Sequence, residues 1–169
     1  TEDDWMRLHA SAGYVITGLL VFRLIWGFVG PRHARFSDFV FSPKVVYAYF
    51  RNMLRGRAAR YVGHNPAGGA MVIALLLLLT ATSVSGIALY AVGDQAGPLA
   101  HWLGGLGESW EDALKHAHEF LANFTLLLVV AHVSGVVAGS VLHEENLVRA
   151  MITGNKKRAD QHPSGTEAM

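Results

Sequence analysis

Residues 71–92, MVIALLLLLTATSVSGIALYAV, contain no charged side chain, and they constrain the fold more than any other part of the chain. A helix needs about 20 consecutive apolar residues to cross the hydrocarbon core of a bilayer. Three stretches meet this requirement, at residues 10–30, 66–92 and 118–142. Hydrophobic residues make up 51% of the chain, charged residues only 16%, and the apolar residues occur in blocks. The sequence therefore predicts an all-α integral membrane helical bundle with three spans.

The charges between the spans predict which segments face the cytoplasm. Residues 31–65 carry seven Lys or Arg and one acid, whereas residues 93–112 carry four acids and no Lys or Arg. The positive-inside rule places residues 31–65 and the C-terminal tail in the cytoplasm. We expect a multi-pass protein of the bacterial inner membrane that contacts membrane lipid. Nucleic-acid binding does not suit a basic loop between membrane spans.

Residues 1–154 are predicted to form one membrane domain, and residues 155–169 a polar cytoplasmic tail. Ser42-Pro43 is typical of a helix start, and the following KVVYAYFRNMLRG has one apolar and one basic stripe. This pattern predicts a short amphipathic cytoplasmic helix that lies on the membrane surface or packs beneath the bundle. The amino terminus would face outside, and the chain begins with Thr. We therefore expect either a cleaved segment or, preferably, a further membrane helix upstream.

His118 and His132 lie 14 residues apart within HEFLANFTLLLVVAH. On a helix this spacing is about 21 Å and nearly four turns, so both imidazoles lie on almost the same face. The separation excludes a shared metal ion, but it suits two haem groups near opposite membrane surfaces. The chain has no Cys, which excludes covalent haem attachment through thiols. For His132, an interhelical hydrogen bond is the alternative to haem ligation.

His9 opens the first span at the same outer level as His118. Because the two helices run in the same direction, both imidazoles can reach one haem iron from opposite sides. Gly13 and Ala122, one turn further along each helix, are small enough to let a flat macrocycle approach the backbone. The alternative for His9 is a position at the membrane boundary without a ligand role.

An inner haem at His132 would need a second ligand. His64, just before the second span, is the one candidate among these spans, and a histidine on an upstream helix is the other. Arg23 lies 14 residues after His9, toward the inner side of the first span. Its guanidinium either reaches the lipid headgroups or pairs with a propionate of the inner haem.

The chain resembles the prokaryotic cytochrome b561 family, which includes the b-type subunits of nickel–iron hydrogenases and formate dehydrogenases. The resemblance rests on HEFLAN with His132, LHASAGY with Arg23, GHNPAGG, and HEENLVRAMITGNKKR, and it covers nearly the whole chain. It implies a four-helix bundle with two haem b groups. His9 and His118 would bind the outer haem, and His132 the inner haem together with a histidine on a first helix that is not in this sequence.

The resemblance also implies electron transfer between the quinone pool and a partner redox protein, such as a c-type cytochrome or a dehydrogenase or hydrogenase subunit. The alternative is a haem-bearing anchor subunit of a larger oxidoreductase complex. A histidine-lined metal-ion transporter would require acidic residues within the spans, and only Glu119 occurs, at a helix end. The sequence has no Ser-His-Asp order and no phosphate loop, which argues against a hydrolase or an ATPase.

Overall fold

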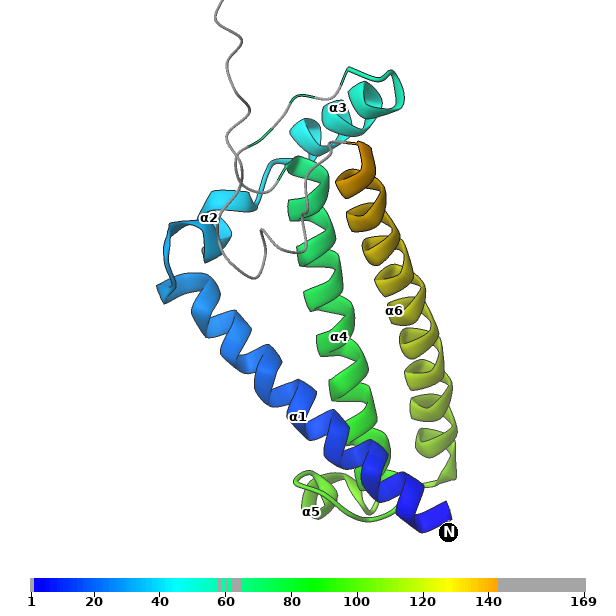
Figure 1. Ribbon diagram of the computed structural model, residues 1–169. Coiled ribbons are helices and arrows are strands. Elements are labelled where there is room, and N and C mark those ends of the chain that lie inside the picture. Colours follow the sequence, from blue (N-terminus) through cyan, green and yellow to red (C-terminus); the bar gives the residue numbers. More distant parts are fainter. Residues whose placement is uncertain (1, 58, 60, 62–64, 143–169) are drawn as a thin grey trace, which may run out of the picture. The chain divides into compact units, whose positions relative to one another are not determined.

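The computed structural model describes residues 2–57, 59, 61 and 65–142, and every regular element in this part of the chain is helical. The long helices are α1 (Glu2–Val29), α4 (Pro66–Gly93) and α6 (Glu108–Leu142) (Figure 1). The stretches long and apolar enough to cross a membrane are Asp4–Val29, Pro66–Gly93 and Glu108–Val137. The prediction of an all-α fold with three membrane-spanning helices is thus confirmed.

Two of the long helices begin earlier than the apolar blocks suggest. α6 starts at Glu108 instead of residue 118, and α1 starts at Glu2 instead of residue 10. Glu108 and Glu111 occupy the first turn of α6, where carboxylates interact favourably with the helix dipole. An apolar run marks the part of a helix that crosses the membrane, and the helix itself continues into polar sequence.

The segment between α1 and α4 contains η1 (Arg32–Ala34), α2 (Phe36–Phe39) and α3 (Pro43–Leu54). The predicted short amphipathic helix is α3, with Ser42 at its N-cap position, although the Ser42 side chain makes no capping hydrogen bond. α3 packs against α4 and leaves Tyr47 and Leu54 largely exposed.

The start of α4 is held by a side-chain cap and by close packing. Asn65 Oδ1 accepts a hydrogen bond from the Gly68 backbone N–H at 2.7 Å, which satisfies one of the free donors at a helix start. Phe39 and Pro66 are fully buried here. Gly69 lies so close to the main chain of Phe39 that a Cβ at this position would collide with its carbonyl oxygen.

A charged cluster joins η1 to α2. His33 Nδ1 lies 2.9 Å from a carboxylate oxygen of Asp38, and Arg32 Nε lies 3.5 Å from the other. The hydrogen bond from His33, followed by the positive charges of His33 and Arg32, lowers the pKa of the Asp38 carboxyl below its ordinary value of 3.8, against a smaller opposing effect of burial.

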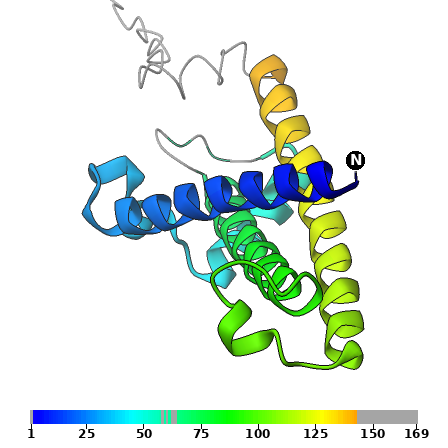
Figure 2. The same cartoon turned by 90° about the horizontal axis from the view of Figure 1, so that it is seen from below.

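The chain forms two compact units, residues 1–130 and 131–169, and α6 crosses the boundary between them. In the first unit, α1, α3 and α5 (Ala100–Leu103) each pack against α4. Viewed from below, α1 crosses α4 instead of running alongside it (Figure 2). In the second unit, the described residues continue α6 to Leu142, and Ser140 Oγ donates to the Val136 carbonyl at 2.8 Å.

Candidate functional site

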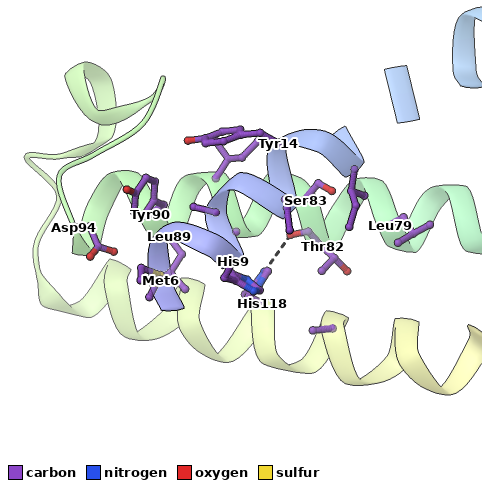
Figure 3. A pocket seen from close by; sticks show the side chains of 17 residues that line it. Met6, His9, Tyr14, Leu79, Thr82, Ser83, Leu89, Tyr90, Asp94 and His118 are labelled. Atoms are coloured by element: carbon purple, nitrogen blue, oxygen red, sulfur yellow. Dashed lines mark hydrogen bonds between the residues drawn. The ribbon is translucent and has the colours of Figure 1, made fainter. Parts of the chain in front are cut away.

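The first unit brings His9 on α1 and His118 on α6 together. Their ring centroids lie 6.1 Å apart, and the ring planes are nearly perpendicular at 85°. Metal–imidazole bonds of about 2 Å place two imidazoles on opposite sides of one ion with ring centres roughly 6 Å apart. The pair therefore has the spacing that two axial ligands of a single iron require, and Figure 3 shows both side chains at the same point of the site.

His118 is held in place by groups on α4. Its Nδ1 lies 3.1 Å from the Thr82 carbonyl oxygen and 3.1 Å from Ser85 Oγ. The bond to Thr82 appears as the dashed line in Figure 3. Because a carbonyl oxygen only accepts hydrogen bonds, Nδ1 carries the proton and donates it. In the neutral imidazole this leaves the lone pair on Nε2, which is then available to bind a metal ion.

A cavity of about 330 Å³ adjoins the two histidines, a size typical of small-molecule and cofactor sites. Its lining is mostly apolar and comes mainly from α1 and α4. Gly13 and Ala122, the small residues expected to leave room for a macrocycle, both line it. A Cβ added at Gly13 would meet no atom within 4 Å, so this stretch of backbone borders open space.

Gly86 on α4 permits the approach of His118. A Cβ at this position would lie 2.8 Å from His118 Cε1 and 3.2 Å from Nδ1, so any larger residue would displace the imidazole. Sequence reasoning did not identify Thr82, Ser85 or Gly86 as part of the site. The hydroxyl residues within this uncharged span could have indicated a contact with another helix, because such side chains in membrane helices commonly form hydrogen bonds to a neighbouring helix.

A second contact joins α4 to α6 two turns beyond His118. Thr82 Oγ1 and Thr125 Oγ1 lie 3.1 Å apart, and Thr125 is buried. Thr82 thus contacts α6 twice, through its carbonyl at His118 and through its hydroxyl at Thr125. The two bonds set the axial position of His118 relative to α4.

His132 and His64 are the two histidines expected at an inner haem site. His132 lies on α6 within the unit 131–169. Its haem ligation and the alternative of an interhelical hydrogen bond both stay predictions. His64 lies outside the described residues. Its expected role as a second ligand stays a prediction.

Arg23 lies over two aromatic rings in the first unit. Its Cζ is 5.4 Å from the ring centroid of Phe36 and 5.7 Å from that of Phe39, distances typical of cation–π contacts. Arg23 Nη1 is buried and has no hydrogen-bond partner among the described residues. A buried donor of this kind is costly unless an acceptor reaches it, which is consistent with an anionic group binding at this position.

Among the described residues, no group of three or more His, Asp or Glu side chains could hold a metal ion. Two histidines that face each other beside an apolar cavity suit an iron whose other ligands would come from a macrocycle. The arrangement matches haem better than a metal ion bound by protein side chains alone.

Comparison with known proteins agrees with this chemistry. Relatives include the probable Ni/Fe-hydrogenase B-type cytochrome subunits of Rhodobacter capsulatus (29% identity, 90% of this chain, 62% of the relative) and Azotobacter vinelandii (29%, 92% and 69%). The probable Ni/Fe-hydrogenase 1 B-type cytochrome subunit of Escherichia coli K12 is 24% identical over 87% of this chain and 68% of its own length.

This chain spans less than two thirds of the length of the Rhodobacter capsulatus relative. No solved structure matches it significantly. The family model described as prokaryotic cytochrome b561 matches residues 1–154, which is most of the chain and includes His9, His118 and the cavity between α1 and α4. The chain belongs to the prokaryotic cytochrome b561 family.

Proposed function

We propose that this chain is a membrane electron-transfer protein whose His9 and His118 side chains bind a haem b. The observation that carries the proposal is the 6.1 Å separation of the two ring centroids, together with the proton on His118 Nδ1 that leaves Nε2 free. When bound, the haem would accept and release single electrons at its iron. The protein supplies the two ligands, the apolar walls and the exclusion of water.

A second haem b at His132 is part of the same proposal. A fourth ligand would come from His64 or from a histidine outside this sequence. Arg23 Nη1 is buried and has no hydrogen-bond partner in the described part of the chain, which supports binding of a carboxylate such as a haem propionate, because that interaction would satisfy the guanidinium. Replacing Arg23 with Gln should therefore lower haem content or shift a haem potential without preventing helix formation.

We further propose exchange of electrons between the quinone pool and a partner redox protein, with a nickel–iron hydrogenase as the first candidate partner. The names of the relatives support the hydrogenase, since each is a probable hydrogenase b-type cytochrome subunit. A dehydrogenase subunit and a c-type cytochrome are the other candidates. We also propose a location in the bacterial inner membrane, and the placement of the basic residues supports a cytoplasmic side for residues 31–65 and the C-terminal tail.

Haem content of the purified full chain, measured by the pyridine haemochromogen assay, tests the proposal. Two matched variants sharpen the assay, because a Cβ at either Gly13 or Gly18 meets no protein atom within 4 Å. Only Gly13 lines the cavity. We expect Gly13→Leu to lose haem and Gly18→Leu to retain it.

A wild-type protein without haem would refute the cytochrome proposal. Equal haem content in the two glycine variants would refute the placement of the haem beside α1. If the haem is bound but is reduced by quinol far more slowly than the partner complex turns over, the chain is a haem-bearing anchor subunit.

A further inference from the structure

Ser85 on α4 lies against the side of the His118 ring that carries Nδ1. Its Oγ is 3.1 Å from Nδ1, and the residue is only 9% exposed. The Ser85 hydroxyl hydrogen is already donated to the Thr82 carbonyl at 3.0 Å. A hydroxyl has one hydrogen and two lone pairs, so Ser85 Oγ is left to accept from the Nδ1–H of His118.

His118 therefore donates a shared hydrogen bond to two acceptors on one helix, Thr82 O and Ser85 Oγ. Such bonds on the non-ligating nitrogen fix the ring orientation and make the ligating nitrogen more basic. A more basic ligand favours ferric over ferrous iron, which lowers the reduction potential. Gly86 adds to this control, since its missing Cβ leaves space for the ring to lie against α4.

We infer that Ser85 is a positioning residue that orients His118 and lowers the reduction potential of the haem bound there. The inference rests on the proposed function, and it concerns a residue that touches the ligand instead of the haem. Removing the hydroxyl also frees the Thr82 carbonyl from one side-chain donor, and leaves it with the Nδ1–H of His118 and the helical N–H of Gly86. That change is secondary, because the carbonyl keeps its bond to the Nδ1–H of His118.

Potentiometric titration of the full chain in nanodiscs tests the inference. The haem bound at His118 is identified as the redox transition that is lost from the titration in His9→Ala. We expect Ser85→Ala to retain this haem. Its ferric–ferrous equilibrium constant should shift roughly three-fold toward ferrous, the size expected for one hydrogen bond. For a one-electron couple this shift is about 28 mV upward.

Thr80→Ala is the matched control, because Thr80 is a hydroxyl residue of the same helix whose Oγ1 donates only to the Leu76 carbonyl. Its potential should equal that of the wild type. Ser85→Thr keeps the hydroxyl and should have the wild-type potential. Ser85→Val has the shape of the Thr variant but lacks the hydroxyl, so its potential should be higher. This second pair decides the question if Ser85→Ala does not accumulate.

An unchanged or lowered potential in Ser85→Ala, or equal potentials in the Thr and Val variants, would overturn the inference while leaving the haem site intact. Absence of haem from the wild-type protein is a different outcome, since it refutes the proposed function itself. Haem content and potential are separate measurements, so the two failures are distinguishable.

Discussion

The imidazole rings of His9 and His118 lie 6.1 Å apart and nearly perpendicular, although they belong to α1 and α6, which are far apart in the sequence. The hydrogen bonds on His118 Nδ1 select the tautomer that a metal ligand needs. The site is therefore prepared for a ligand by the protein alone.

If His9 and His118 bind a haem as proposed, substituting either histidine should remove it. We expect His9→Ala and His118→Ala each to lower occupancy of this haem by about ten-fold or more, because iron keeps only one axial ligand. The ferric absorption and EPR spectra of the purified variants, compared with wild type, measure the loss. His116→Ala is the control, since His116 is exposed and two residues from His118. Equal losses in all three variants would contradict the assignment.

Gly86→Ala should displace the His118 ring. Its Cβ would lie 2.8 Å from His118 Cε1, and overpacking of this kind costs about 1–3 kcal/mol. We expect weaker haem binding, measured by titrating haem into the apoprotein. Gly18→Ala adds the same methyl where nothing lies within 4 Å and should leave haem affinity unchanged. Normal affinity in Gly86→Ala would show that the imidazole does not bind in this position.

The bond between Thr82 and Thr125 should couple α4 to α6 energetically. In a double-mutant cycle of Thr82→Val and Thr125→Val, we expect a coupling energy of about 0.6 kcal/mol, the average for hydrogen bonds between membrane helices. Unfolding in mixed micelles measures it. Thr17→Val serves as the comparison partner for Thr125→Val, because the Thr17 hydroxyl donates within its own helix to the Gly13 carbonyl. Equal coupling in both cycles would argue against the contact.

The loop between α1 and α3 should lose part of its stability in acid. Since the pKa of Asp38 is lowered, its contribution is fully present above pH 3.8 and is lost as the pH falls through the lowered pKa. His33→Ala removes the main cause and should raise the Asp38 pKa toward 3.8, and Arg32→Ala should raise it less. Carboxyl NMR titration of labelled protein measures these values. A wild-type pKa at or above 3.8 would contradict the ion-pair geometry.

Much of the architecture could be predicted from local properties of the sequence. Apolar length identified the three spans, and Ser42-Pro43 located the start of α3. α1 and α6 extend beyond the apolar blocks, because polar residues that continue a helix past the membrane resemble a loop in a hydropathy pattern. Asn65 was noted only as a break before the second span, whereas its side chain caps α4.

The sequence by itself determined that His9 and His118 lie at the same level of two parallel-running helices, because helix rise and membrane thickness set the depth of each residue. It could not determine which residues of α4 face them. Only the tertiary structure showed that Ser85, Thr82 and Gly86 meet the His118 ring. The physical reason is that rotation and axial shift between helices depend on side-chain packing, and an almost uniformly apolar span carries no periodic pattern that reveals its buried face.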